Sequence, residues 1–585
     1  MTQIAKINTI NFRGDVYNNQ TSPVIANKTS ANQDTKAAGM YLDNLAMINA
    51  PAVKKVDASK NIAKPYKNNL RSMIQNNESV MLAIVPRTFT AQDLNGDDKI
   101  TLSAGEKNGT FLSAISRLDE LKADGINTIH ILPIHPTGKK NAMGTAGSVY
   151  SPLKFVEDNG DLAIDPMLID KNDPRTPNEQ FKAFIDECHK RDIKVMLDLP
   201  SCASVDLFEA EPELMAFGRN GEDKTPQGWA DIRMFEPWAD ETKRTLNPAL
   251  YEMHRQYVDA CIELGLDGIR ADVARAKPTE FWDKLITYSH TKDPEFAWLG
   301  ESYTYECASP QVNMMYDRPE DLLRAGFDDY YGQYHIFHDW KGAREFNDYI
   351  IMNLDMSHRL PAGKSVIGSF LTHDDSSSMI HGGENFCKLT TVLQSTIPMC
   401  NPYFVDGFQS GDYYDYKYRD TENEETFTDK KTMEEHRYRL AIFNLSRKPG
   451  GDSPDIERVM KGCMKMRSEN LDVLANRDSS FIELDKRDDV NDQIITFARH
   501  HNGRTILVVA NKNPNRNVTG IIEIPGLKKE QKLNNMVPEY GDTSEFQVSE
   551  GELKVNLAPA DAYVFEIDTP NLEADRKGHA FKQKV

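Results

Sequence analysis

Short apolar runs alternate with helical patterns along most of this chain, and this alternation limits the possible folds more than any other feature. Residues 80–85, 126–132 and 193–199 are apolar runs of strand length, and each is followed by apolar residues at helical spacing. Further strands are predicted at 266–269, 296–299, 365–371 and 397–405. Such alternation is typical of parallel βαβ units. Their number over about 400 residues predicts an α/β fold with a (β/α)8 barrel of the TIM type, rather than an open doubly wound sheet.

The regions on either side of the predicted barrel differ from it in amino-acid composition and pattern. Residues 1–76 are rich in Asn, Lys, Ala, Ser and Thr and predict a flexible N-terminal extension. The catalytic barrel is predicted over 77–477, with an inserted polar subdomain at about 200–247, after the third strand. Residues 478–569 hold short β-branched runs between Asn, Gly and Pro clusters, which predict a C-terminal antiparallel β-sandwich. Residues 570–585 are predicted to be a loose, charged tail.

Charge and cysteine content exclude several classes of partner. Asp and Glu outnumber Lys and Arg by 89 to 69, a formal net charge of −20. Nucleic acids and anionic membranes attract basic surfaces, so we expect neither as the main partner. The sequence does not indicate the oligomeric state. The seven cysteines include no C-x-x-C pair, and the first residues lack the apolar segment of a signal peptide. With no apolar stretch near the length of a membrane span, about 20 residues, a cytoplasmic location is expected.

Acidic residues recur at the ends of four predicted strands. The acids at the ends of the third, fourth, fifth and seventh strands are Asp198, Asp272, Glu301, and the pair Asp374 and Asp375. Because the carboxyl ends of parallel strands meet at the catalytic rim of a barrel, we expect these acids to lie together. A single Asp after a strand is often a helix N-cap or a turn residue. Four such positions, with Arg270 two residues before one of them, instead indicate a catalytic site.

The segments that carry these acids resemble four signature segments of the α-amylase superfamily, glycoside hydrolase family thirteen. They are VMLDLPS, DGIRADVARA, LGES and GSFLTHDDS. The G-x-R-x-D signature is specific when a Gly-Glu ends the next strand, and here the two acids are 301 − 272 = 29 residues apart. The resemblance covers residues 79–567 and includes ILPIHP, in the second strand and its loop, and the YSP segment at Tyr150. It implies a β/α barrel with a C-terminal sandwich, the fold that the periodicity also predicts.

The resemblance implies a retaining mechanism carried by two acids. Asp272 would be the nucleophile and Glu301 the general acid/base. Arg270 would keep the nucleophile ionised, because a cation within about 4–6 Å lowers the pKa of a carboxylic acid. Two carboxylates about 5–5.5 Å apart that flank a glycosidic bond give a covalent glycosyl-enzyme and net retention of configuration. Tyr150, Asp198 and Arg270 would bind the substrate.

The third acid of the family, which holds sugar hydroxyls in the transition state, has two possible positions. The family pattern is F-x-x-N-H-D. A match without gaps from Gly368 places Asp375 on the final Asp, whereas matching the His-Asp pair itself selects His373 and Asp374 and requires one deletion. We favour Asp374 as the catalytic residue, because an imidazole–carboxylate pair has a specific hydrogen-bonding role. His373 and Asp375 would then be substrate-binding residues.

Two departures from the family pattern bear on the reaction. Cys202 and Ala203 stand where the family usually has Asn and His, and Arg275 and Ala276 stand where it often has Lys and His. The missing imidazole removes a contact to the donor sugar, which argues against ordinary amylase activity. RADVARAKPTEFWDKLI and DLPSCAS are more similar to the maltosyltransferase branches of the superfamily. His130, on an apolar strand, is interpreted as an interior residue.

The resemblance therefore implies a retaining α-glycosidase or transglycosidase that acts on α-glucans or maltooligosaccharides through a covalent glycosyl-enzyme. The departures favour a glucanotransferase or maltosyltransferase. Two alternatives stay open: an α-amylase-type hydrolase, and a catalytically silent carbohydrate-binding protein on the same fold. No organic cofactor is expected.

The loop after the first predicted strand resembles a calcium loop. Asp93, Asn95 and Asp97 place side-chain oxygens at alternate positions, and Ca²⁺ takes about six to eight hard oxygen ligands. The oligo-1,6-glucosidase branch of the superfamily has a similar loop at this place, which would add Lys99 and Thr101 to the ligand set. Thr101 replaces a final Asp of that pattern. The alternative is a solvated acidic turn.

Overall fold

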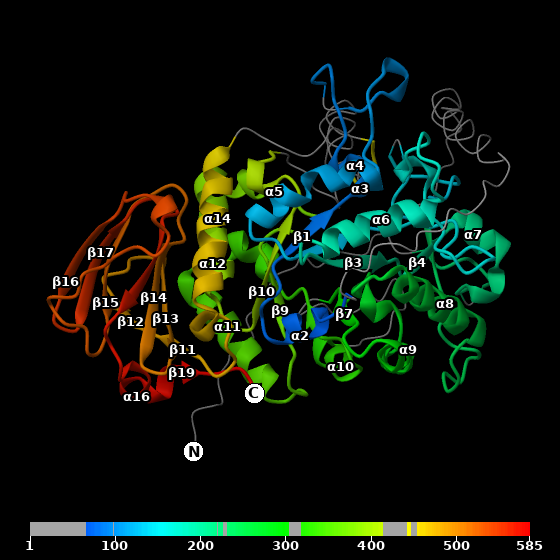
Figure 1. Ribbon diagram of the computed structural model, residues 1–585. Helices are drawn as coiled ribbons and strands as arrows, with labels where there is room; N and C mark the ends of the chain where they lie inside the picture. The colour runs from blue at the N-terminus through cyan, green and yellow to red at the C-terminus, as the bar shows by residue number, and fades with distance from the viewer. Residues whose placement is uncertain are drawn as a thin grey trace. The chain divides into compact units, whose positions relative to one another are not determined.

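The computed structural model describes most of the chain from Tyr66 onward. The described ranges are 66–97, 99–144, 146–218, 220–225, 231–302, 318–413, 441–445 and 453–585. The predicted N-terminal extension therefore lies outside the described residues up to position 65. The rest comprises a barrel, an insertion after its third strand and a C-terminal sandwich (Figure 1).

Eight parallel strands form the barrel sheet in the described part of the chain. They are β1 (Met81–Ile84), β2 (Thr128–Ile131), β3 (Lys194–Leu199), β6 (Gly268–Ala271), β7 (Ala297–Gly300), β8 (Asp329–Tyr330), β9 (Val366–Ser369) and β10 (Cys400–Val405). Their order is β8-β7-β6-β3-β2-β1-β10-β9. Where β9 meets β8, Ser365 N donates to Asp328 O at 3.0 Å. The predicted (β/α)8 barrel is confirmed, and the strand that the sequence did not predict is the two-residue β8.

Helices surround this sheet (Figure 1). They are α3 (Pro86–Phe89), α4 (Phe111–Ala114), α5 (Leu118–Ala123), α6 (Pro177–His189), α8 (Pro248–Leu264), α9 (Thr279–Lys292), α10 (Pro319–Arg324), α11 (Ala343–Ser357), α12 (Gly383–Thr396), α14 (Pro454–Glu469) and α15 (Leu471–Leu474). Local sequence sets their ends. Asn247 caps α8 through hydrogen bonds from the N–H groups of residues 249 and 250, and Gly265 ends the helix with a φ of 90°.

Side chains of each barrel strand alternate between the barrel interior and the surrounding helices. In β3, Val195 and Leu197 pack with the helices, whereas Met196 belongs to an interior cluster with Leu299 and Tyr403. Asp198, two residues after Met196, therefore faces the interior as well. The parallel register places it directly opposite Arg270 of β6.

The short helix α2 (Leu70–Gln75) closes the N-terminal end of the barrel. Leu70 and Ile74 have no exposed surface and join the interior cluster that contains Met81 and Ala83. The prediction of a flexible extension over 1–76 is therefore wrong for residues 66–76. Leu70 and Ile74 are four residues apart, so one helix face presents both to the open end of the barrel.

The insertion after β3 carries a small antiparallel pair of strands. β4 (Cys202–Ser204) pairs with β5 (Ile232–Met234), and α7 (Val205–Ala210) follows β4 directly. Cys202, Ile232 and Met234 form a separate small core with Ala216 and Ala276. Because Ala276 follows β6, this core ties the insertion to the loop that carries Asp272.

Two antiparallel sheets form the C-terminal domain, as the sequence predicts. One sheet contains β11 (Ser480–Glu483), β13 (Ile494–His501), β14 (Arg504–Asn511), β18 (Ala562–Ile567) and β19 (Ala580–Phe581). The other contains β12 (Asp485–Arg487), β15 (Val518–Glu523), β16 (Glu545–Ser549) and β17 (Glu552–Leu557). In β14, Leu507 and Val509 pack between the sheets, whereas Ile506 and Val508 join the large core of the barrel helices.

The last residues of the chain are anchored rather than loose. They form α16 (Leu572–Asp575) and β19, which pairs with β11. Gln583, which is 3% exposed, donates to Lys364 O at 2.8 Å and accepts from Asn77 Nδ2 at 2.9 Å. The prediction of a loose tail over 570–585 is therefore wrong, because buried partners far away in sequence order this segment.

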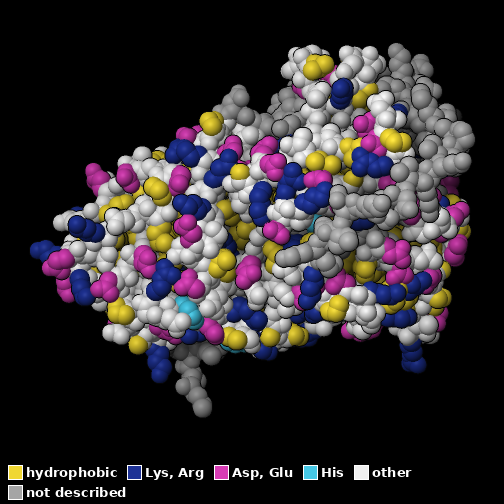
Figure 2. Space-filling model, viewed as in Figure 1, with side chains coloured by type: hydrophobic (Ala, Val, Ile, Leu, Met, Phe, Trp, Pro, Cys, Tyr) yellow, Lys and Arg dark blue, Asp and Glu magenta, His cyan; other side chains and the backbone are white. Residues whose placement is uncertain are grey.

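The surface is of mixed charge. On the face in Figure 2, lysine and arginine side chains are interspersed with aspartate and glutamate. Among the described residues, the large exposed apolar side chains come from six separate segments: Tyr66, Leu94, Phe217, Tyr413, Val490 and Val585. Among the described helices, none combines the length and the apolar character that a membrane crossing requires.

Candidate active site

One buried guanidinium joins three carboxylates at the carboxyl end of the barrel. Arg270, which is 1% exposed, donates through Nη1 to both oxygens of Asp198 at 2.9 and 3.0 Å and to Asp272 Oδ1 at 3.0 Å. Its Nη2 lies 2.9 Å from Glu301 Oε2. Asp198 lies in β3, whereas Asp272 and Glu301 directly follow β6 and β7, and these three strands are neighbours in the sheet. The expectation that strand-end acids meet on one rim holds for these three.

Asp272 is held on one side by a cation and on the other by a backbone N–H. Besides Arg270, Ser201 N donates to its Oδ2 at 3.2 Å, and Ser201 Oγ donates to the Asp272 carbonyl. Burial and then the charge of Glu301 raise the pKa of Asp272 well above its usual value, and the opposing effects of Arg270 and the Ser201 N–H reduce this rise without reversing it. One acid ionised and its neighbour protonated is the state that a retaining mechanism requires.

Glu301 receives a hydrogen bond from a strained peptide. Val273 N donates to Glu301 Oε2 at 2.7 Å, and Val273 has a left-handed conformation with φ 35° and ψ 58°. A β-branched residue rarely adopts this conformation, and such strain concentrates at functional sites. Val273 directly follows Asp272, so the same turn presents the candidate nucleophile and an N–H group for the candidate acid.

Asp198 lies deeper than the other acids and has several donors. Tyr150 OH donates to Asp198 Oδ2 at 2.9 Å, and His130 Nε2 lies 3.1 Å from the same oxygen. Although burial raises its pKa, Arg270 and then His130 hold the pKa of Asp198 below its usual value. With no exposed surface, Asp198 supports the site from below rather than facing open solvent.

The two candidates for the third acid point to different partners. His373 Nε2 lies 2.7 Å from Tyr150 OH and 3.4 Å from Asp374 Oδ2. Desolvation and then the charge of Glu301 raise the pKa of Asp374, although its side chain is 31% exposed. Asp375 instead accepts from Thr372 N at 3.2 Å and from Thr372 Oγ1, a local turn. The choice of Asp374 stays a prediction, and the turn contacts of Asp375 favour it.

The residues that depart from the family pattern lie on β4 and near η5 (Ala274–Ala276). Cys202 Sγ lies 3.8 Å from Met234 Sδ, and Ala203 is fully buried, so both pack inside the insertion. Lys277, which sequence reasoning passed over, donates to Ser201 O at 3.2 Å. Burial lowers the pKa of Lys277 to about 8. Its only signal in the sequence is the Lys-Pro that precedes α9.

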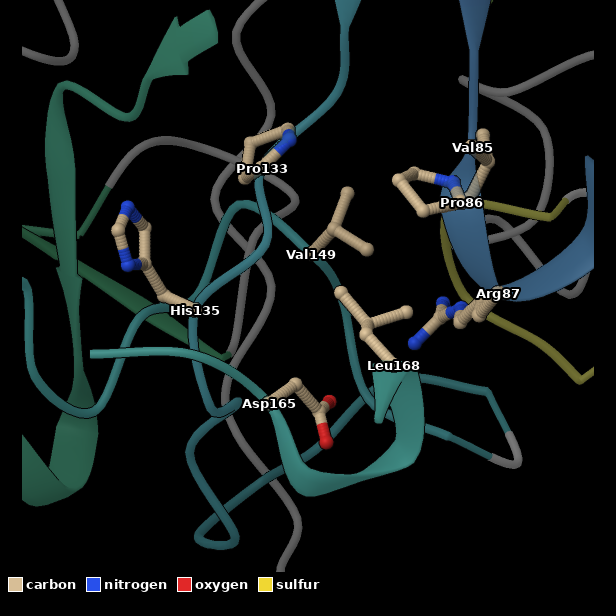
Figure 3. A pocket seen from close by; sticks show the side chains of 8 residues that line it. All are labelled: Val85, Pro86, Arg87, Pro133, His135, Val149, Asp165 and Leu168. Carbon is tan, nitrogen blue, oxygen red and sulfur yellow. The ribbon is translucent and has the colours of Figure 1, made fainter. Parts of the chain in front are cut away.

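A small cavity lies at the start of the loops after β1 and β2 (Figure 3). Its walls are Val85, Pro86, Arg87, Pro133, His135, Val149, Asp165 and Leu168. Burial raises the pKa of Asp165 to about 6 and lowers that of His135 to about 4. None of the candidate acids lines this cavity, so it is not where the proposed chemistry would take place.

The predicted calcium loop is held by its own backbone. Asp93 Oδ1, Asn95 Oδ1 and Asp97 Oδ1 each accept a backbone N–H, from Gly96, Asp97 and Lys99 respectively. No group of three or more acidic, histidine or cysteine side chains among the described residues is arranged to hold a metal ion. These contacts fit the solvated turn, and calcium stays a prediction.

The same loop surrounds a buried carboxylate. Glu106 is 4% exposed and accepts from Leu94 N at 2.9 Å and Thr101 N at 2.6 Å. Lys99 and Thr101 thus lie in a turn that closes over Glu106. The ligand set that the sequence suggests does not include Glu106, although its buried carboxylate accepts backbone N–H groups from both sides of the loop.

The barrel and the C-terminal sandwich together form a fold similar to that of solved α-amylases. Two solved structures with this fold are a maltogenic α-amylase from Thermotoga neapolitana and an α-amylase from Lactobacillus plantarum. The first has a TM-score of 0.61 and 20% identity, over 85% of this chain and 99% of that chain. The second has a TM-score of 0.59 and 17% identity, over 84% of this chain and 99% of that chain. No family model matches the chain.

Curated relatives point to one branch of the superfamily. An α-1,4-glucan:maltose-1-phosphate maltosyltransferase from Picrophilus torridus is 23% identical over 529 residues, 86% of this chain and 73% of the relative. The protein of the same name from Corynebacterium glutamicum is 24% identical over 423 residues, 70% of this chain and 56% of the relative. This chain thus spans only part of each relative. It resembles the α-amylase superfamily, with similarity to its maltosyltransferases.

Proposed function

We propose that this protein is a retaining transglycosidase that transfers a maltosyl or similar short α-glucan unit to an α-glucan acceptor. The observation that carries the proposal is Arg270, which contacts Asp198, Asp272 and Glu301 at 2.9–3.0 Å. The similarity to maltosyltransferases favours transfer, and maltose 1-phosphate, the donor in their name, is the first donor to test.

The first half-reaction uses the two acids in complementary states. Asp272 attacks the anomeric carbon as its carboxylate, and a bond from that carbon to Asp272 forms. Glu301 gives its proton to the departing oxygen, so the bond between the anomeric carbon and the leaving group breaks. Arg270 and Ser201 N–H favour the ionised state of Asp272. Positive charge that develops on the sugar is stabilised by the surrounding carboxylates.

The second half-reaction decides between transfer and hydrolysis. Glu301, now ionised, takes a proton from the attacking hydroxyl, which displaces Asp272 and restores the original configuration. An acceptor sugar hydroxyl gives a longer glucan, whereas water gives a free sugar. In this proposal Asp374, beside His373 on the rim, holds sugar hydroxyls in both steps.

The test is incubation with maltose 1-phosphate and a maltooligosaccharide acceptor, followed by product analysis. Transfer predicts inorganic phosphate together with chains longer by one donor unit, and the new linkages should keep the α configuration. Free maltose without elongation would instead establish an α-amylase-type hydrolase. An unchanged mixture with this donor and with plain maltooligosaccharides would indicate a silent binding protein. Asp272→Asn is the matched control.

We expect this chemistry to take place in a reducing compartment such as the cytoplasm. The structure describes six of the seven cysteines. All six are buried, and none of them forms a disulfide. Burial raises the pKa of the Cys202 thiol to about 12 and also raises the pKa of the other five, so they are poor nucleophiles.

A further inference from the structure

His130 connects the candidate site to a chain of tyrosines inside the barrel. It lies on β2 and has no exposed surface. Nε2 is 3.1 Å from Asp198 Oδ2, and Nδ1 is 2.9 Å from Tyr403 OH. Tyr403 OH in turn lies 3.1 Å from Tyr331 OH. Both ring nitrogens therefore have a polar partner, and neither partner is a backbone group.

These partners determine where the proton of His130 lies. Asp198 is ionised beside Arg270, and an ionised carboxylate only accepts hydrogen bonds, so Nε2 must carry a proton. Burial lowers the pKa of His130, so the ring is neutral and Nδ1 has no proton. Tyr403 then donates to Nδ1, and Tyr331 donates to Tyr403. The arrangement gives His130 one tautomer and one ring orientation.

Asp198 links His130 to the reacting acids through Arg270. It contacts Arg270 Nη1 through both oxygens, and the same Nη1 donates to Asp272. Without the donor from His130, the Asp198 carboxylate keeps Tyr150 OH and Arg270 Nη1 as donors but loses its contact to β2. Any shift of this carboxylate would move Arg270 with it. Positions of catalytic groups must be held to within about 0.5 Å for full activity.

We propose that His130 is a positioning residue, which fixes Arg270 for Asp272 and Glu301 by donating a hydrogen bond to Asp198. His130 lies beneath Asp198 and has no exposed surface with which to meet a sugar. The inference rests on the proposed function, because it concerns the geometry of the proposed nucleophile and acid.

His254 provides a matched control within the same barrel. It is also buried, at 1% exposure, and burial lowers its pKa as well. Its Nδ1 lies 2.9 Å from Leu250 O, and its ring packs against Phe155 and Phe281. It has no contact with a candidate acid, so its loss should affect packing alone.

The experiment measures kcat and KM with α-maltosyl fluoride as a generic activated donor. His130→Leu removes both polar contacts and should lower kcat about ten- to a hundred-fold, the effect of one lost charge-assisted hydrogen bond, with KM little changed. His130→Gln keeps an N–H group in place of Nε2 and should recover most of that loss. His254→Leu should lower the melting temperature and leave kcat unchanged.

Several results would overturn the inference. They are an unchanged kcat in His130→Leu, a Gln variant as impaired as the Leu variant, or an equal loss of kcat in His254→Leu. If His130→Leu does not fold, Tyr403→Phe replaces it: a smaller fall in kcat is expected, and no fall would be decisive against the inference. An inactive wild-type protein would instead contradict the proposed function.

A spectroscopic measurement separates the two failures. In protein labelled with ¹⁵N-histidine, the ring signals that disappear in His130→Gln should be those of a neutral Nε2–H tautomer from pH 6 to 8. Asp198→Asn should shift these signals. A protonated ring or an Nδ1–H tautomer would contradict the inference whether or not any glucan is a substrate.

Discussion

Aspartates are buried at both ends of the barrel, but their hydrogen-bond donors are arranged differently. At the N-terminal end, Asp267 accepts from Tyr66 OH, from Val195 N at 2.8 Å and from His189 Nε2 at 2.8 Å. Asp328 accepts from Arg71 Nε at 3.1 Å, from Gln75 Nε2 at 3.2 Å and from Trp298 N at 3.1 Å. Each of these carboxylates has donors of its own.

At the catalytic end, donors are shared. The single guanidinium of Arg270 contacts Asp198, Asp272 and Glu301. A nitrogen of His373 lies 3.4 Å from Asp374. Burial and neighbouring carboxylates raise the pKa of Asp272 and of Asp374. The same residue type therefore stabilises the fold where its hydrogen bonds are satisfied. Where its donor is shared and neighbouring carboxylates raise its pKa, it is a candidate for proton transfer or nucleophilic attack.

The largest expected effect is at Asp272. Asp272→Ala should abolish turnover. The melting temperature should stay equal or rise, because the substitution removes a buried carboxylate that lies close to two other carboxylates. An activated fluoro-sugar should label Asp272 in the wild-type protein, as peptide mass spectrometry would detect. Labelling of Asp198 instead would overturn the assignment. A large drop in the melting temperature of Asp272→Ala would show that Asp272 stabilises the fold, as we infer for the aspartates at the opposite end.

Glu301 should show the next largest effect, and it should depend on the leaving group. Glu301→Gln cannot donate a proton, so donors with poor leaving groups should slow far more than activated donors such as a glycosyl fluoride. The measurement is kcat/KM for a series of donors with leaving groups of different acidity. Equal slowing of all donors would argue against an acid role for Glu301.

The pair after β9 distinguishes two registers. Asp374→Asn should lower kcat about ten- to a hundred-fold, since a charge-assisted contact of about 1.5–3 kcal/mol is lost in the transition state. Asp375→Asn should be nearly silent, because the hydrogen bonds of the Asp375 side chain to described residues go to Thr372. His373→Ala should resemble Asp374→Asn. The reverse order, with Asp375→Asn the crippling change, would show that the match without gaps is right.

At the opposite end, the prediction concerns stability instead of rate. Asp267→Ala leaves Tyr66, His189 and the Val195 N–H without their acceptor, and should lower the free energy of unfolding by about 3 kcal/mol. The kcat of the folded variant should match the wild type. Denaturant unfolding and steady-state kinetics on the same sample test this. A loss of kcat comparable to that of Asp374→Asn would show that the two ends are coupled.

The smallest expected effect is that of calcium. If the loop binds Ca²⁺, a chelator should lower the melting temperature by about 2–4 °C, because a ligand that binds only the folded state stabilises it. Ca²⁺ should restore it and Mg²⁺ should not, since Mg²⁺ requires a smaller and stricter octahedron. Asp93→Ala should abolish the response. An unchanged melting curve, with no metal in the purified protein, would leave the solvated turn.

Much of the barrel could be predicted because its signals are local. Seven of its strands are apolar runs, and the acids that follow them can be found by position alone. β8 was missed because Asp329 and Tyr330 make too short a strand to show a pattern. The sequence favours an interior position for His130 but does not reveal its role, because that role depends on Asp198 and Tyr403, which lie 68 and 273 residues away.

The sequence by itself determined the order of the elements, the set of strand-end acids and the resemblance to one superfamily. Only the tertiary structure decided which carboxylates share a guanidinium, that Asp375 belongs to a turn, and that residues 66–76 and 570–585 are ordered. The physical reason is that periodicity and capping act within a few residues, whereas hydrogen-bond satisfaction is shared among groups from distant strands. Tyr66 illustrates this, since its order depends on Asp267, 201 residues away.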